Sequence, residues 1–288
     1  MIPRYVEPLF RPPAEAGSLI FQVAYGCPHN RCRFCGMYKG VPYRPRPEAE
    51  LFAEIAAAGE RYPGTRRIFL ADGDVMALGF DRLKPILEAL NAAFPHLARV
   101  NSYANGSSIA QYDDSELAAL KSLRLQTLYL GLETGMQTLL DRVGKTEQIT
   151  QMVESVRRTQ TAGMRASVMV LLGLGGREFS HEHAVRTAET LNRMQPRLLS
   201  ALRFVPVLGE PFEGFRLLSE AGVVAELLVL VESLELEHTV FRANHTSNPL
   251  PLEARFPADK AWLTAELRHV LTSGMLDETG PGFLPAEL

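Results

Sequence analysis

The sequence predicts an α/β fold, a partial (β/α)6 barrel with a mostly helical C-terminal extension. Six short and almost continuously apolar segments begin near residues 19, 67, 98, 126, 166 and 198, and helical segments separate them. Such segments indicate parallel strands that are covered by helices and joined by right-handed crossovers. Glycine-rich or polar residues follow these strands, and functional groups at the carboxyl ends of parallel strands are typical of the active face of such folds.

The six predicted strands are rich in β-branched and other apolar residues. They cover residues 18–25, 67–71, 98–103, 126–132, 166–172 and 198–205. Between them, helices are predicted over 47–62, over 81–94, from residue 114, up to residue 162 and over 181–194. Asp114 stands where an N-cap is expected, Gly163 ends a helix before the fifth strand, and Pro206 ends the sixth strand.

The two ends of the chain differ in character from the predicted barrel at residues 18–221. Residues 1–17 are rich in proline and are expected to be an extended N-terminal segment. Residues 222–288 are expected to close the barrel rather than to form an independent domain. In this extension we predict helices over 223–236 and 257–273, a short strand over 239–242 and irregular backbone over 243–252.

Composition and charge narrow the range of function classes. Of the 288 residues, 46% are hydrophobic and 22% are charged, as in ordinary globular proteins. The formal net charge of −3 gives no reason to expect a nucleic-acid partner. Residues 1–17 lack the apolar core of a signal peptide, and no apolar run reaches membrane-spanning length. We therefore expect a cytoplasmic protein without a membrane partner.

The most specific feature is the loop after the first strand, at residues 26–38. It holds all three cysteines, with four residues between Cys27 and Cys32 and two between Cys32 and Cys35. Three thiolates with one coordination position left open suit a [4Fe–4S] cluster whose fourth iron binds another molecule. The alternative is a structural zinc site with His29 as fourth ligand, but a Cys3His site this compact would be cramped.

A first strand that runs into a three-cysteine loop, followed by βα units, resembles the radical S-adenosylmethionine (radical SAM) superfamily over residues 18–220. The resemblance implies that Cys27, Cys32 and Cys35 hold a [4Fe–4S] cluster whose open iron chelates S-adenosylmethionine. It also implies reductive cleavage of this cofactor to methionine and a 5′-deoxyadenosyl radical that abstracts hydrogen from a substrate. The commonest family pattern has three residues between the first two cysteines, so the loop in this chain is a variant.

The resemblance implies roles for several residues near the cysteines and after the second strand. Phe34 would lie near the adenine, and the backbone of Met37 or Tyr38 would bond the adenine edge. Further residues stand where the family often has a Gly-Gly-Glu-like stretch that meets the methionyl amino group: Asp72, Gly73 and Asp74. Carboxylate oxygens can accept hydrogen bonds from an ammonium group. The alternative for the two aspartates is a solvated turn that caps a helix.

Later strand ends carry further candidates. Glu133 stands where related proteins place a polar residue on the ribose or the methionyl end, although it could instead be a helix N-terminal carboxylate. Gly173 and Gly175 resemble the glycine-bearing segment that lies under adenine, although they could form only a tight turn. Lys145 or Arg157 would meet the methionyl carboxylate. The segment L-G-L-E-T-G is similar to the branch that holds oxygen-independent coproporphyrinogen oxidase and the methylthiotransferases.

These observations lead to one expected function and two alternatives. We expect a radical SAM enzyme with a single cluster that acts on a small molecule and takes its electron from a donor such as flavodoxin or ferredoxin. No cysteine remains for an auxiliary cluster, which disfavours the methylthiotransferases. The alternatives are a non-enzymatic carrier of haem or of a cluster, with the same fold, and a zinc-stabilised binding protein. Most of the seven histidines are assigned to the surface by default.

Overall fold

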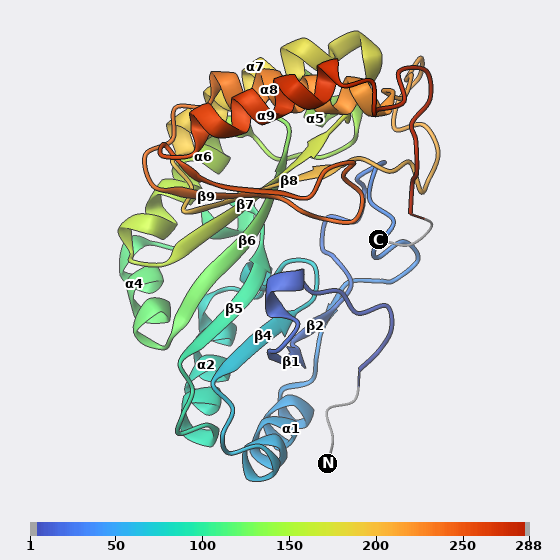
Figure 1. Ribbon diagram of the computed structural model, residues 1–288. Helices are drawn as coiled ribbons and strands as arrows, with labels where there is room; N and C mark the ends of the chain where they lie inside the picture. The colour runs from blue at the N-terminus through green and yellow to red at the C-terminus, as the bar shows by residue number, and fades with distance from the viewer. Residues whose placement is uncertain (1–4, 286–288) are drawn as a thin grey trace. The chain divides into compact units, whose positions relative to one another are not determined.

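A computed structural model describes residues 5–285, which divide into two compact units (Figure 1). The described residues of the first unit are 5–30, 37–130 and 155–166, and those of the second are 31–36, 131–154 and 167–285. Residues 1–4 and 286–288, the ends of the predicted N-terminal segment and of the C-terminal extension, lie outside the described residues.

The first unit contains the strands of the N-terminal part of the sheet, together with the small second sheet. These are β1 (Leu19–Gln22), β2 (Ala24–Tyr25), β3 (Arg44–Pro45), β4 (Arg67–Ala71), β5 (Arg99–Ala104) and most of β6 (Leu125–Glu133). Its helices are η1 (Pro13–Glu15), α1 (Glu48–Arg61), η2 (Val75–Leu78), α2 (Phe80–Ala93), α3 (Gly106–Ile109) and α4 (Asp114–Ser122). Strands and helices alternate here as the sequence predicts.

The second unit continues the same alternation. Its strands are most of β7 (Arg165–Leu172), then β8 (Leu198–Arg203), β9 (Thr239–Ala243) and β10 (Leu252–Phe256). Its helices are α5 (Gln137–Arg142), α7 (Gly176–Met194), α8 (Glu220–Ser233) and α9 (Lys260–Thr272), and α6 (Ile149–Thr161) has residues in both units. Helix α8 packs against both α7 and α9 (Figure 1).

The strands confirm a mostly parallel sheet. Among the described residues, eight strands form one sheet in the order β1-β4-β5-β6-β7-β8-β9-β10, and β2 and β3 form a small second sheet. The pairs β1–β4, β4–β5, β5–β6, β7–β8 and β8–β9 are parallel, whereas β9–β10 is antiparallel. The sheet does not close on itself in this order, which agrees with the predicted partial barrel.

Three local differences from the sequence prediction have simple physical reasons. The N-cap of α4 is Asp113, one residue earlier than predicted, where a capping box pairs its carboxylate and backbone N–H with Glu116. Helix α7 begins at Gly176 rather than at residue 181; Gly176 has a positive φ of 62°, which glycine adopts without strain, and so makes the turn from β7 into the helix. Strand β10 was missed, since its alternating residues follow a proline-rich turn.

The N-terminal segment is anchored on the sheet rather than simply extended. Glu15 is buried in η1, and its carboxylate accepts hydrogen bonds from Asn101 Nδ2 and from Tyr129 Oη, both at 2.7 Å. Asn101 Oδ1 in turn accepts a bond from the backbone N–H of Thr127 at 2.9 Å. This network joins residues of η1, β5 and β6, so Glu15 anchors η1 on these two strands.

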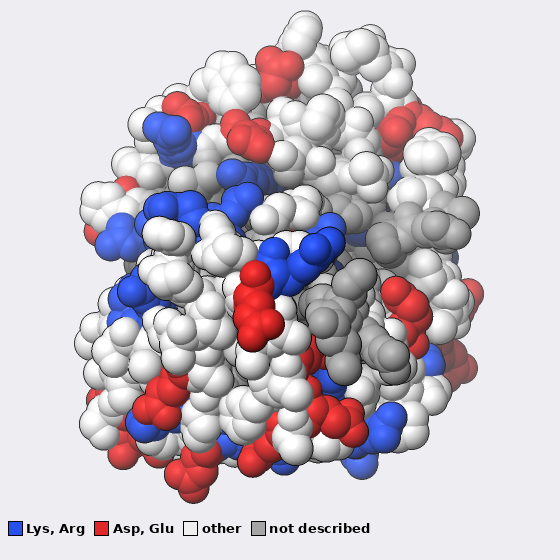
Figure 2. All heavy atoms as spheres, turned by 90° about the horizontal axis from the view of Figure 1, so that it is seen from below, with Lys and Arg blue, Asp and Glu red and all other residues white. Residues whose placement is uncertain are grey.

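Charges of both signs are present on the surface. On the face drawn in Figure 2, many basic side chains lie across the middle, and acidic side chains lie mostly around the rim, at the top as well as at the bottom. Neither sign covers this face completely. Among residues 5–285, no helix has the length and apolar character needed to cross a membrane.

Candidate functional site

In the first unit, Asp72 connects the end of β4 to the cysteine loop. Its carboxylate accepts hydrogen bonds from Gln22 Nε2 at 3.1 Å, from the backbone N–H of Gly26 at 3.2 Å and from Tyr38 Oη at 3.2 Å. Asp72 is only 1% exposed, so the alternative of a solvated turn is wrong for this residue. The buried Tyr38 ring also packs edge-on against Phe10. Asp72 therefore fixes the start of the cysteine loop against β1 and β4.

Gly73 is placed where only glycine leaves room for the loop. A Cβ atom at this position would lie 2.7 Å from Cys27 Cβ and 3.1 Å from Cys27 Cα. The backbone N–H of Gly73 donates a hydrogen bond to Gly26 O at 3.1 Å. The structure therefore brings two predicted site residues, Gly73 and Cys27, into direct contact.

Asp74 contacts the segment that follows β5. Its carboxylate accepts hydrogen bonds from Ser108 Oγ at 2.5 Å and from Asn105 Nδ2 at 3.0 Å, and Asp74 is 2% exposed. A solvated turn is therefore also wrong for Asp74. Met37, the remaining candidate in this unit, is half-buried in a turn.

The buried position of Asp72 predicts a pH-dependent stability. Burial raises the pKa of Asp72 to about 6, although hydrogen bonds from Gln22, Tyr38 and Gly26 oppose this. Between pH 4 and 6 the folded state then binds more protons than the unfolded state, so this carboxyl lowers stability as the pH rises. The variant Asp72→Asn lacks this carboxyl. We therefore expect its free energy of unfolding to fall by about 3 kcal/mol less than that of the wild type as the pH rises through this range. Urea unfolding of both proteins at pH 4 and pH 7 measures this change. An equal change between the two pH values in the wild type and in Asp72→Asn would contradict the raised pKa of Asp72.

In the second unit, the segment with Cys32 and Cys35 is held against the end of α5. The backbone N–H of Arg33 donates to Val143 O at 2.8 Å, and that of Cys35 donates to Cys32 O at 3.4 Å. Gly144 has a positive φ of 72°, and a Cβ there would lie 3.1 Å from Arg31 O. Gly144 therefore allows the turn after α5 to approach the backbone of the cysteine segment.

Phe34 lies in an apolar cluster. Its ring packs against a set of buried residues from α5, the β7–α7 turn and the chain after β8, namely Met136, Leu139, Val143, Leu174, Phe204, Phe212 and Phe215. Phe34 is itself only half-buried. The cluster therefore fixes Phe34, the residue directly before Cys35, while part of the Phe34 side chain stays exposed.

Glu133 and Lys145 form a buried ion pair. Lys145 Nζ donates to Glu133 Oε1 at 2.8 Å and also to Gly131 O. Glu133 has a positive φ of 64° and folds back over Gly131, where a Cβ would lie 1.9 Å from its carboxylate. Burial alone would lower the pKa of Lys145, but attraction by Glu133 and Cys32 outweighs it, so this pKa lies above its ordinary value. The sequence offered Lys145 and Arg157 as candidates for the methionyl carboxylate. Lys145 is buried in this ion pair, whereas Arg157 is exposed on α6.

The Gly173–Gly176 turn is held by residues that sequence reasoning missed. Gly176 N–H donates to Gly173 O at 3.0 Å, so the predicted tight turn is present. Gly173 N–H donates to Glu226 Oε1 at 2.6 Å, and Ser180 Oγ donates to Glu226 Oε2 at 2.6 Å. Burial raises the pKa of Glu226. In the same turn, a Cβ on Gly175 would lie 3.0 Å from Phe179 Cβ. Glycine at this position therefore leaves room for the Phe179 side chain of α7.

His183 extends this network. It is 2% exposed, so the default assignment of histidines to the surface is wrong for this residue. One ring nitrogen lies 2.8 Å from Thr134 Oγ1, and the other lies 3.1 Å from Leu171 O and 3.5 Å from Glu226. His183 therefore connects the residue after Glu133 to the residues that hold the glycine turn. The isolated Glu226 in an apolar helical segment was the sequence signal for such a contact.

The donor set of the cysteine loop fits an iron–sulfur cluster. All three cysteines are reduced thiols outside any disulfide, and all three are half-buried. They are divided between the units, with Cys27 in the first and Cys32 and Cys35 in the second. Within residues 5–285 no group of three His, Cys, Asp or Glu side chains is already gathered as a metal site. The fit therefore rests on the chemistry of three reduced thiols and on the close approach of Gly73 to the first of them.

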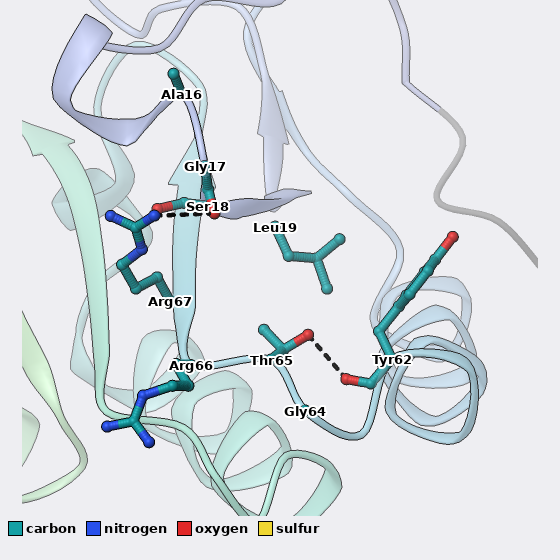
Figure 3. Close-up of a pocket in the computed structure, with 9 residues that line it drawn as sticks. All are labelled: Ala16, Gly17, Ser18, Leu19, Tyr62, Gly64, Thr65, Arg66 and Arg67. Carbon is teal, nitrogen blue, oxygen red and sulfur yellow. Dashed lines mark hydrogen bonds between the residues drawn. The ribbon is translucent and has the colours of Figure 1, made fainter.

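A hollow of about 590 Å³ lies at the other ends of the strands (Figure 3). It is lined by the first residues of β1 and β4 and by residues that precede these strands, namely Ala16, Gly17, Ser18, Leu19, Tyr62, Gly64, Thr65, Arg66 and Arg67. Arg67 donates a long hydrogen bond to Gly17 O, and Thr65 Oγ1 donates to Tyr62 O. No predicted site residue lines this hollow, which separates it from the candidate site.

A family model identifies the class of protein. The model of the radical SAM superfamily matches residues 21–191, which is more than half of the chain. The chain belongs to the radical SAM superfamily. The matched segment includes the three cysteines, Glu133 and the glycine turn, which confirms the resemblance seen in the sequence.

The individual relatives that match this chain are distant in sequence. The heme chaperone HemW of Bacillus subtilis (strain 168) is 24% identical over 147 residues, which cover 50% of this chain and 38% of that protein. An uncharacterized protein of Methanopyrus kandleri is 26% identical over 201 residues, or 64% of this chain and 37% of that protein. The chain therefore spans less than two fifths of the length of these two curated relatives.

Two solved structures illustrate the similarity of fold. Coproporphyrinogen III oxidase (HemN) from Escherichia coli matches with a TM-score of 0.58 at 13% identity, over 75% of this chain and 52% of that chain. Methylornithine synthase (PylB) matches with a TM-score of 0.54 at 15% identity, over 88% and 81% of the two chains. At these identities the likeness concerns the fold alone, and it supports the partial barrel.

Proposed function

We propose that this chain is a radical SAM enzyme that holds one [4Fe–4S] cluster on Cys27, Cys32 and Cys35. The observation that carries the proposal is the match of the superfamily model to a segment that holds three reduced cysteines, none of them in a disulfide. When bound, the cluster and S-adenosylmethionine supply one-electron cleavage of the sulfonium and a 5′-deoxyadenosyl radical that removes hydrogen from a substrate. The remaining chemistry belongs to the side chains around the loop.

The chain's own residues would bind and orient the cofactors. Lys145 has three N–H donors, of which Glu133 and Gly131 take two, so one is left for the methionyl carboxylate. Phe34 offers a ring edge to the adenine, and the backbone of Met37 or Tyr38 would bond the adenine edge. Asp74 would accept from the methionyl ammonium group, with Asp72 holding the loop in place.

The glycine turn would lie against the adenine. Gly173 has a positive φ of 79°, and Gly175 follows it in the turn. Glu226 holds the Gly173 N–H, so the turn is fixed before any ligand arrives. A backbone without side chains can approach a flat ring closely, and this placement would help to exclude water from the reacting centre.

The substrate is proposed to be a small organic molecule, and the electron donor to be a protein such as flavodoxin or ferredoxin. We expect the anaerobically reconstituted full chain, reduced with dithionite, to convert S-adenosylmethionine to 5′-deoxyadenosine, which liquid chromatography detects. Cys35→Ala is the matched variant that should lose this product. A reconstituted protein with a full complement of iron and no 5′-deoxyadenosine would overturn the proposal.

The similarity to a heme chaperone favours a second candidate function. A chain that carries haem rather than performing radical chemistry would bind haem and form little 5′-deoxyadenosine. Titration with haem, followed by its absorbance, together with the cleavage assay on the same preparation separates the two. Haem binding without cofactor cleavage would support the carrier, and cleavage without haem binding would support the enzyme.

A further inference from the structure

Arg203 is a buried charged residue outside all the predicted site positions. It is the last residue of β8 and pairs in register with Leu172 of β7. It shares one face of its strand with Leu199 and Ala201, and it is 2% exposed. It belongs to the largest fully buried side chains of the protein. A guanidinium group placed this way cannot be solvated by bulk water.

The guanidinium group of Arg203 is not satisfied by the protein. Across residues 5–285, none of its three nitrogens has a hydrogen-bond partner. Glu220 attracts it electrostatically, but the described residues show no ion pair between the two. The buried Arg46 is different, because it forms a 2.9 Å ion pair with Glu54 and donates to Gln22 O at 3.1 Å. Arg203 is thus a buried cation with its donors unused.

This arrangement has a large energetic cost unless an anion completes it. Taking an unpaired charge out of water costs several kcal/mol. Loss of a proton does not remove this cost, because arginine stays charged in proteins. The planar guanidinium presents five N–H donors in a fixed fork, which matches two oxygens of a carboxylate or phosphate. A small oxyanion would therefore satisfy both the charge and the donors.

We propose that Arg203 is the binding residue of an oxyanion site at the carboxyl end of β8, and that its ligand is a small molecule with a carboxylate or phosphate group. The site does not depend on the proposed radical chemistry, since it needs neither the cluster nor S-adenosylmethionine. A sequence signal exists, because Arg203 is the single charged residue in the apolar run L-L-S-A-L-R. Arg203 ends its strand, and the carboxyl ends of parallel strands are where ligands commonly bind in open α/β sheets.

The test measures unfolding midpoints of the full chain without cluster, in chloride, acetate and inorganic phosphate at equal ionic strength. Because a ligand that binds only the folded state raises stability with its concentration, we expect acetate or phosphate to raise the midpoint of the wild type. Arg203→Met should lose this response. In chloride the same variant should be at least as stable as the wild type, since it removes a buried charge without a partner.

Two further variants act as controls. Arg186→Met removes a guanidinium whose side chain is 56% exposed, and it should keep the full response to the anion. Arg203→Lys keeps the charge but loses the planar fork, so it should bind the anion several-fold more weakly. This variant keeps the test informative if Arg203→Met does not fold.

The result distinguishes the sources of the oxyanion. A response to acetate alone assigns a carboxylate ligand, and a response to phosphate alone assigns a phosphate ligand. A wild type that responds to neither would overturn the proposal, and so would an equal response in Arg203→Met. Strong coupling between Arg203→Met and Glu220→Gln, with no anion response, would overturn it by showing that Glu220 is the partner in solution.

Discussion

Replacement of Lys145 by methionine is expected to destabilise the protein by about 3–5 kcal/mol, because it leaves the Glu133 carboxylate buried without its cation. The side chains of this pair are 6% and 12% exposed, so water cannot take the place of the lost ammonium group. The loss should appear in urea unfolding of the chain without cluster. The variant should also bind S-adenosylmethionine weakly, since the proposed donor to the methionyl carboxylate is gone.

Two matched variants make this expectation specific. Lys84 forms an exposed pair with Glu88 on α2, and Lys84→Met should change stability by less than about 0.5 kcal/mol. The double variant Glu133→Gln with Lys145→Met removes both charges, and it should recover a large part of the stability lost in Lys145→Met. A Lys145→Met protein as stable as the wild type would show that the pair is not buried in solution.

Replacement of Gly73 by alanine is expected to prevent normal binding of the cluster. The added Cβ would lie 2.7 Å from Cys27 Cβ, 3.1 Å from Cys27 Cα and 3.1 Å from the Tyr38 ring, so the loop has to shift. Crowding of this kind costs about 1–3 kcal/mol in a close-packed region. Because the shift moves a proposed ligand, the iron content after anaerobic reconstitution should fall well below that of the wild type.

Gly64→Ala is the control for this prediction. A Cβ at Gly64 meets no atom within 4 Å, so the alanine should leave the iron content unchanged and have little effect on stability. Equal iron content in Gly73→Ala and Gly64→Ala would contradict the role of Gly73 in placing Cys27.

The sequence was sufficient for the fold class because buried parallel strands are short apolar runs, and such runs stand out without any tertiary information. Strand β4 is an example, predicted and found at 67–71. The features of the fold that the sequence does not predict depend on contacts between distant segments. The first predicted strand, at 18–25, is divided into β1 and β2, because the chain after Gln22 leaves β4 and pairs with β3.

The same distinction holds for the candidate site. The placement of the cysteine loop and of Glu133 at the ends of strands could be predicted, because both stand at the end of an apolar run in the sequence. The carboxylate of Glu226 on Gly173 could not, since 53 residues separate the two partners. Single charges in apolar runs, such as Glu226 in α8 and Arg203 in β8, were nevertheless visible in the sequence. A charged residue is almost never fully buried without a partner, so such positions indicate a contact or a ligand.

The central claim is that Cys27, Cys32 and Cys35 hold a [4Fe–4S] cluster with one iron open to S-adenosylmethionine. Electron paramagnetic resonance of the anaerobically reconstituted, dithionite-reduced full chain tests it directly. The claim predicts the signal of a reduced cluster whose g values change when S-adenosylmethionine is added, and loss of this signal in Cys32→Ala. A cluster signal that S-adenosylmethionine leaves unchanged, or one that persists in Cys32→Ala, would contradict it.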